Sequence, residues 1–115
     1  MIESVKFSDE FSKAFKKLKK RYKSLPDDFL SLLHELKENP IQGVALKNGM
    51  RKVRISFASK NLGKSGGGRA IIRLTVSETC LSFLYIYDKQ DMSNVAETFL
   101  DQLIMEMDDN SNEIK

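Results

Sequence analysis

The pattern of apolar and polar residues predicts one strand and two helices in the first forty positions. Residues 1–7 alternate apolar and polar side chains, which is typical of a short strand. Ser8 can cap a helix whose first turn is acidic, and apolar positions then recur at helical spacing. Pro26 starts a second helix, and Pro40 ends it because the residue before a proline resists helical geometry. We therefore expect a helical hairpin over residues 8–38.

The rest of the chain predicts three strands and a last helix. A connecting loop at 43–49 leads to three strand-like runs within residues 50–88, which we expect to pair as antiparallel strands. Residues 93–107 carry apolar side chains at helical spacing. The order is strand, helix, helix, three strands, helix. It predicts an α+β fold with an antiparallel sheet of about four strands and the helices packed on one face. We expect residues 1–115 to form a single domain.

Several classes of protein do not fit this composition. No apolar run approaches the roughly 20 residues that span a bilayer, and the N-terminus does not resemble a signal peptide. The single cysteine, Cys80, excludes an internal disulfide and fits a reducing compartment. One cysteine and one histidine also cannot form the usual four-ligand zinc site. We therefore expect a cytoplasmic protein with no membrane partner, no metal and no cofactor.

The formal net charge of +3 conceals an uneven distribution of charge. No Asp or Glu occurs between Asn39 and Ser77, while a second basic cluster lies within residues 13–23 and the C-terminal end is acidic. A basic middle segment of this kind favours a polyanion-binding surface. The cations of the acid-free segment are Lys47, Arg51, Lys52, Arg54, Lys60, Lys64, Arg69 and Arg73.

Strict alternation along the three strands predicts which side chains share a face of the sheet. It places Leu84 with Ile86 on one face and Phe83 on the other, beside the tyrosines of the same strand. Bases can stack on tyrosine rings, and phosphates can pair with neighbouring cations, so the basic face is a candidate RNA surface. The residues predicted to share that face are Lys52, Arg54, Arg69, Arg73, Tyr85, Tyr87 and Lys89.

Other motifs give weaker evidence for function. Gly63-Lys64-Ser65 resembles part of a phosphate-binding P-loop, but position 58 is Ala58 rather than glycine, and the segment leads into a strand. His34 and Cys80 are better explained as a surface or partly buried histidine and a small core residue. No pair of carboxylates lies in the basic segment, so a metal-dependent or glycosidase-type site lacks support.

Three runs together resemble the RelE/ParE toxin superfamily, most closely its HigB-like branch. They are Gly49-Met50-Arg51-Lys52-Val53-Arg54, Gly63-Lys64-Ser65-Gly66-Gly67-Gly68-Arg69 and Tyr85-Ile86-Tyr87-Asp88-Lys89. The resemblance implies the toxin of a type II toxin–antitoxin system: a metal-independent endoribonuclease that cuts mRNA in the ribosomal A site. It also implies a cognate antitoxin attached to a DNA-binding domain, through which the complex binds operator DNA.

The resemblance also implies residue roles. Arg69 would clamp the transition state, Lys52 and Arg54 would contact phosphate, and Tyr87 or Lys89 would serve in proton transfer. The chain departs from RelE at Gln90 and Ala96, where RelE has an arginine and, further on, a tyrosine. Two alternatives remain open, namely a ParE-like inhibitor of DNA gyrase and a non-catalytic RNA-binding module. Predicted contacts to RNA or the ribosome are Lys60, Lys64, Arg73, Arg51 and Tyr85.

Overall fold

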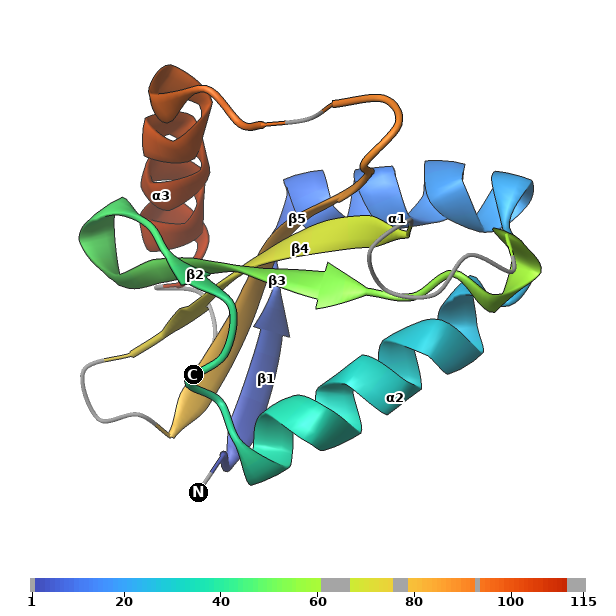
Figure 1. The fold of residues 1–115 in the computed structure, drawn as a ribbon. Coiled ribbons are helices and arrows are strands. Elements are labelled where there is room, and N and C mark those ends of the chain that lie inside the picture. Colours follow the sequence, from blue (N-terminus) through green and yellow to red (C-terminus); the bar gives the residue numbers. More distant parts are fainter. Residues whose placement is uncertain (1, 61–66, 76–78, 93, 112–115) are drawn as a thin grey trace.

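A computed structural model describes residues 2–60, 67–75, 79–92 and 94–111. Its five-stranded sheet has the order β1-β5-β4-β3-β2 (Figure 1). Two short 3₁₀ turns, Lys47–Gly49 and Ala58–Lys60, flank β3. The longer elements are β1 (Ser4–Phe7), α1 (Asp9–Arg21), α2 (Leu25–Glu38), β2 (Val44–Ala45), β3 (Met50–Ile55), β4 (Gly68–Leu74), β5 (Cys80–Asp88) and α3 (Glu97–Ser111).

The α+β class and the helical hairpin are confirmed, whereas the sheet differs in detail from the prediction. It is mixed rather than antiparallel, because β1 pairs with β5 in parallel while the other neighbours are antiparallel. A fifth strand, β2, forms inside the loop predicted at 43–49. The last helix spans Glu97–Ser111 rather than 93–107. The parallel pair requires a long crossover, which the two helices and the strands after them supply.

The predicted cap of the first helix is present and also ties the helix to the sheet. The Ser8 hydroxyl oxygen accepts a hydrogen bond from the Phe11 backbone N–H at 3.0 Å. The same hydroxyl donates to the Leu84 carbonyl at 2.9 Å, and the Ser8 N–H donates to the Phe83 carbonyl. One buried side chain thus satisfies an open helix end and fixes α1 beside β5.

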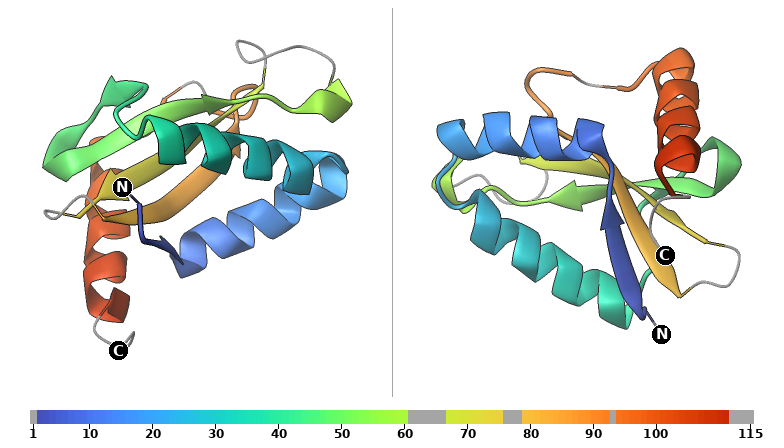
Figure 2. Two further views of the ribbon diagram at one scale, coloured as in Figure 1. Left: turned by 90° about the horizontal axis from the view of Figure 1, so that it is seen from below. Right: turned by 180° about the vertical axis from the view of Figure 1, so that it is seen from behind.

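The helices lie on both faces of the sheet, so the prediction of helices on one face is wrong for α3. Figure 2 shows α1 and α2 on one side and α3 on the other. The strands are apolar on both faces, which gives α3 a surface of its own: Met50, Ile71 and Leu84 pack with Leu100 and Leu103. The hairpin face buries Phe11, Leu18, Leu25, Phe29, Leu32, Leu36, Val53, Ile55, Phe57, Ala70, Ile72, Leu81, Phe83 and Ile86.

A β-bulge in β5 overturns the alternation predicted for that strand. Ile71 lies opposite Tyr85 and Ile72 opposite Phe83, so the residue between them on β5 has no counterpart on β4. Phe83 therefore joins Ile86 in the hairpin core, and Leu84 joins the α3 side. The prediction that Leu84 accompanies Ile86, and Phe83 the tyrosines, is wrong because one extra residue reverses the alternation.

Candidate active site and nucleic-acid interface

Three of the predicted cations meet at one cleft of about 580 Å³. Lys52 and Arg54 reach it from β3, and Arg69 reaches it from β4. The opposite wall comes from the segment before and within β2, which contributes Gln42, Gly43 and Val44. None of these lining residues is acidic, so the lining of the cleft carries a net positive charge. Such a lining attracts an anion of phosphate type.

The register of the strands places two arginines side by side. Arg54 lies directly opposite Arg69, and Arg69 lies opposite Tyr87 on the next strand. Like charges opposite each other on a sheet destabilise it, unless an anion lies between them. The Arg69 guanidinium donates to the Gly68 carbonyl at 2.9 Å, which ties the guanidinium to its own strand. An anion in the cleft would relieve the repulsion between the two guanidinium groups.

Tyr87, which lies opposite Arg69 on β5, is a buried residue with a polar group. Only 4% of the residue is exposed, and its hydroxyl has no hydrogen-bond partner among the described residues. Burial raises the pKa of Tyr87, and the nearby positive charge of Arg69 partly opposes that rise. The phenol therefore remains protonated at neutral pH. An unsatisfied buried hydroxyl costs stability, which marks Tyr87 as a candidate functional group.

Tyr85 is less available than the sequence suggested. Its ring stacks on Tyr87 at 6.0 Å between centroids and meets Phe99 edge-on at 4.8 Å. The start of α3 thus covers the aromatic part of the predicted surface, and the residue is half-buried. Burial is the largest cause that raises the pKa of Tyr85. A base could stack on this ring only from the side that α3 leaves open.

Lys89 is exposed and follows β5 directly, at the end of the sheet where β4 begins. Its backbone N–H donates to the Gly67 carbonyl at 3.2 Å. Gly68 leaves no room for a side chain, because a Cβ there would clash with the Tyr87 carbonyl and the Phe57 ring. The absence of a Cβ lets β4 approach β5 closely, and so brings Arg69 and Lys89 to the same end of the sheet.

The remaining predicted contacts lie apart from the cleft or cannot be placed. Arg73 lies opposite Met50, four residues along β4 from Arg69, or about 13 Å at strand spacing. The Arg51 guanidinium donates to the carbonyls of Gln42 at 2.6 Å and Gly43 at 3.1 Å, so it braces the cleft wall. Lys64 and the Lys60 side chain lie outside the described residues.

The wall formed by Gln42, Gly43 and Val44 was missed by sequence reasoning. Gly43 has a φ of +77°, and a Cβ there would clash with the Lys52 carbonyl. Only glycine allows the chain to pass this close to β3. The glycine was visible in the sequence, but a strand of two residues leaves no alternation to detect.

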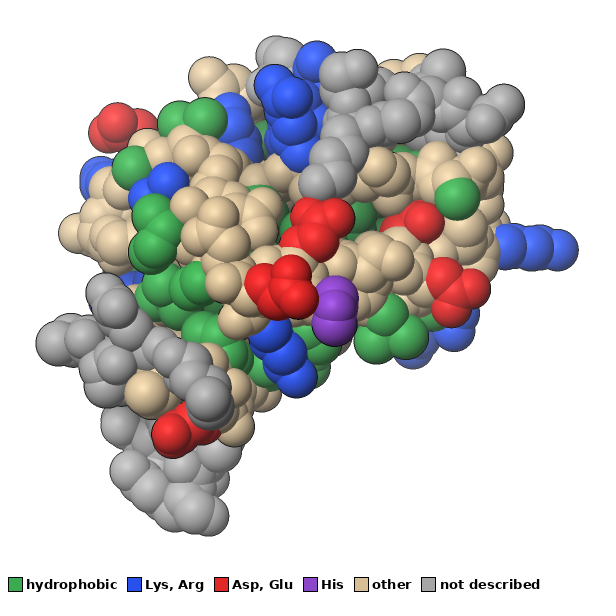
Figure 3. All heavy atoms as spheres, turned by 60° about the horizontal axis from the view of Figure 1, so that its bottom comes forward, with side chains coloured by type: hydrophobic (Ala, Val, Ile, Leu, Met, Phe, Trp, Pro, Cys, Tyr) green, Lys and Arg blue, Asp and Glu red, His purple; other side chains and the backbone are tan. Residues whose placement is uncertain are grey.

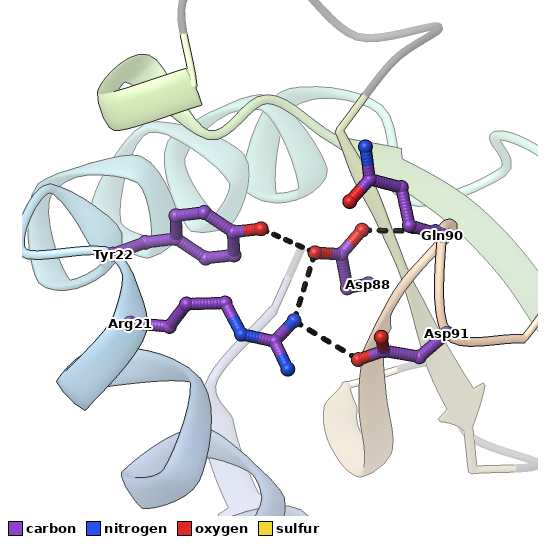
Figure 4. A network of polar contacts seen from close by, with 5 residues as sticks. All are labelled: Arg21, Tyr22, Asp88, Gln90 and Asp91. Carbon is purple, nitrogen blue, oxygen red and sulfur yellow. Dashed lines mark hydrogen bonds and ion pairs between the residues drawn. The ribbon is translucent and has the colours of Figure 1, made fainter.

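A buried carboxylate behind the site was also missed. Asp88 is fully buried and accepts hydrogen bonds from the Tyr22 hydroxyl and, at 3.1 Å, from Arg21 (Figure 4). The Arg21 guanidinium also donates to Asp91 at 3.0 Å. Hydrogen bonding to Asp91 is the main cause that raises the pKa of Arg21. The partners are 66 or more positions apart in sequence, so no local pattern could reveal them.

The other candidate groups lie away from the cleft. His34 is on the outer surface of α2, where its Nε2 is 3.8 Å from a Glu38 carboxylate oxygen. Figure 3 shows acidic side chains around the histidine, while a group of Lys and Arg side chains lies along the upper edge. Cys80 is buried at the start of β5. Within the described residues, no cluster of His, Cys, Asp or Glu could hold a metal ion, and no helix is long and apolar enough to cross a membrane.

These features define a small α+β protein with a cationic cleft on one face of a mixed sheet. The family model of the RelE toxin of the RelE/RelB toxin–antitoxin system matches residues 10–107. The chain therefore belongs to the RelE family of toxins, and this membership implies a cognate antitoxin. Among solved structures, a free-state double-arginine mutant of the E. coli toxin RelE covers 100% of both chains, with a TM-score of 0.56 and 14% identity. No curated protein sequence matches.

Proposed function

We propose that this toxin is a ribosome-dependent endoribonuclease that cuts mRNA and so stops translation. The observation that carries the proposal is the cleft, in which Lys52, Arg54 and Arg69 converge without an acidic lining residue. RNA is the polyanion that a toxin of the RelE family is expected to meet there. A cleft with cationic walls suits a backbone phosphate.

The proposed reaction needs only the RNA, the protein and water. The ribose 2′-oxygen gives its proton to a water molecule and attacks the adjacent phosphorus, forming a 2′,3′-cyclic phosphate. The bond to the 5′-oxygen breaks, and that oxygen takes up a proton. Negative charge on the phosphate oxygens rises in the transition state, where Arg69 can bind two of them with its planar guanidinium. Lys52 and Arg54 would hold the phosphate in line for attack.

Two groups are candidates for the proton given to the 5′-oxygen. Tyr87 is protonated at neutral pH because of its raised pKa, but its hydroxyl is covered. Lys89 is exposed at the end of the sheet where β4 begins, and an ammonium group is a donor with three protons. Each group thus has a proton to give, and access favours Lys89. Ribosome binding would have to uncover Tyr87 for it to act as the acid.

The cationic cleft also suggests how the toxin would meet its partners, the antitoxin and the ribosome. A cognate antitoxin would neutralise the toxin by covering the cationic cleft with an acidic segment, and its DNA-binding domain would carry the complex to operator DNA. The proposed target, a translating ribosome, places the reaction in the cytoplasm. Arg51, Lys60, Lys64, Arg73 and Tyr85 stay predictions as contacts to messenger or ribosomal RNA.

The deciding experiment is a cell-free translation reaction in which mRNA 5′ ends are read by primer extension. New ends should appear with wild-type protein only while ribosomes translate, and Arg69→Ala should slow their appearance by about 10²–10³-fold. Lys37→Ala is the matched control, because it removes an exposed cation from α2, a helix that contributes no residue to the cleft lining. Intact mRNA with wild-type protein at ribosome stoichiometry refutes the proposal. A gyrase supercoiling assay would then test the ParE-like alternative.

A further inference from the structure

The buried carboxylate of Asp88 organises the turn that follows β5. One carboxylate oxygen accepts from Tyr22 and Arg21, and the other accepts from the Gln90 backbone N–H at 2.9 Å. The Asp88 carbonyl accepts from the Asp91 N–H at 2.9 Å, which closes the turn. Figure 4 shows these groups converging on Asp88 from the end of α1 and from the turn. The turn is therefore held from inside by a charge on its first residue.

The same turn is fixed to the strand that carries the transition-state candidate. Lys89 lies between Asp88 and Gln90, whose N–H donates to the Asp88 carboxylate, and the Lys89 N–H donates to the Gly67 carbonyl at 3.2 Å. Asp88 itself pairs with Gly68, the residue before Arg69. A shift of the turn would therefore move Lys89 directly and Arg69 through its neighbour. The end of α1 is thereby connected to Lys89 and to Arg69, two residues of the proposed reaction centre.

Stability alone does not explain a charged group at this position. The Tyr22 ring already stacks on Phe57 at 4.8 Å between centroids, so the contact with the core persists without its hydroxyl. Burying a carboxylate carries a desolvation penalty that pairing only offsets, and an apolar replacement often folds equally well. Fixed charge-assisted hydrogen bonds, in contrast, define the direction of the groups that they join. The network therefore fixes the orientation of the groups that its hydrogen bonds join.

We infer that Arg21, Tyr22 and Asp88 are positioning residues, which hold Lys89 and Arg69 in register for one phosphate. The inference rests on the proposed function, because it assigns the network a role in that reaction. None of the three residues is among those that line the cleft. They act through the turn, and the consequence is a lower rate for bound substrate rather than weaker binding.

The test compares Tyr22→Phe and Arg21→Met with Ser59→Ala. Tyr22→Phe removes one hydrogen bond to Asp88 and keeps the ring. Ser59→Ala is the control, because it removes a hydroxyl that accepts from the Ser24 N–H near the same hairpin end, without contact to Asp88. For both test variants, single-turnover cleavage on ribosomes should slow about tenfold, while the ribosome concentration at half-maximal rate stays unchanged. Arg21→Lys should recover part of the rate, because an ammonium can still donate to Asp88.

A second readout is independent of cleavage. Hydrogen exchange at the Lys89 amide should accelerate about tenfold in the two test variants, while amides of α2 exchange as in wild type. Unchanged exchange at Lys89 overturns the structural half of the inference. Accelerated exchange with a wild-type cleavage rate overturns the positioning role and leaves the ribonuclease proposal intact. If the wild-type protein cuts no mRNA, the proposed function fails, and with it the role in catalysis.

Discussion

The two faces of the sheet carry out different tasks with the same strands. On the hairpin face, α1 and α2 cover a continuous apolar core that includes the closely packed rings of Phe11, Phe29 and Phe83. On the other face, α3 covers a smaller cluster around Ile71 and leaves the ends of β3 and β4 to cations. One face buries apolar side chains throughout, whereas part of the other face is a charged cleft.

This difference predicts that stability and function can be changed separately in this toxin. Alternate residues of β3 go to opposite faces, so Val53 and Ile55 hold the fold while Lys52 and Arg54 serve the cleft. A substitution in one set should therefore leave the other property nearly unchanged. Four predictions test that separation.

The largest effect is expected in the hairpin core. Phe83→Ala should lower the free energy of unfolding by about 3–5 kcal/mol, because a fully buried ring is replaced by a cavity. Urea denaturation followed by circular dichroism measures the change. Met105→Ala on α3 is the control, since that side chain is 66% exposed and should alter stability by less than about 0.5 kcal/mol. Equal losses for the two variants would contradict the division between core and periphery.

The next largest effect is expected in the cleft, where the cleavage rate should fall while the free energy of unfolding does not. Arg54→Ala should slow mRNA cleavage by about 10²-fold, because one of the cations that hold the phosphate is lost. The free energy of unfolding should not fall, and can rise, because the like charge opposite Arg69 is relieved. Primer extension and urea denaturation on the same preparation measure both quantities. A large loss of stability would show that Arg54 belongs to the fold rather than to the cleft.

A smaller effect depends on pH. The pKa of folded Tyr87 is raised above its ordinary value of 10, so the folded state holds the phenol proton more tightly than the unfolded chain does. The associated stability is fully present below pH 10 and is lost as the pH rises through the folded pKa. Tyr87→Phe has no hydroxyl that can ionise, so the variant does not lose this stability. Its stability relative to wild type should therefore increase above pH 10, as measured by thermal unfolding between pH 7 and pH 11. A constant difference across that range would contradict the raised pKa.

The smallest effect is expected where α3 is attached at the surface. Lys47 lies 3.0 Å from Asp101 and 3.7 Å from Glu97, and all three side chains are partly or largely exposed. Lys47→Ala should speed hydrogen exchange in α3 slightly and leave amides of α1 unchanged, because exposed ion pairs are weak. Added salt should remove the difference between variant and wild type. A difference that persists at 1 M salt would indicate a packing role for the Lys47 stem.

Local signals predicted much of this molecule correctly. The Ser8 cap, the proline at the start of α2 and the strand-like runs lie close to where the sequence places them. The convergence of Lys52, Arg54 and Arg69 was predicted from alternation on β3 and β4, which contain no bulge relative to each other. Where the pairing stays regular, a period of two is enough to assign a face.

The errors in assigning faces of the sheet arise where distant segments meet. Leu84 and Phe83 exchange faces because β5 bulges beside the cap of α1, where the Ser8 hydroxyl bonds the Leu84 carbonyl. The place of α3 depends on which sheet face remained uncovered after the hairpin had packed. Neither the bulge nor the position of α3 can be detected from the sequence of the residues immediately around it.

The sequence by itself determined the helices, most strands and the separation of cations from acids, because capping, alternation and charge are properties of neighbouring residues. Only the tertiary structure decided the parallel pairing of β1 with β5, the second covered face and the cleft wall at Gly43. It also joined Arg21 and Tyr22 to Asp88 across the chain. Contacts of that kind are chosen by which surfaces remain to be buried and which charges remain to be paired, and that choice exists only once the chain is folded.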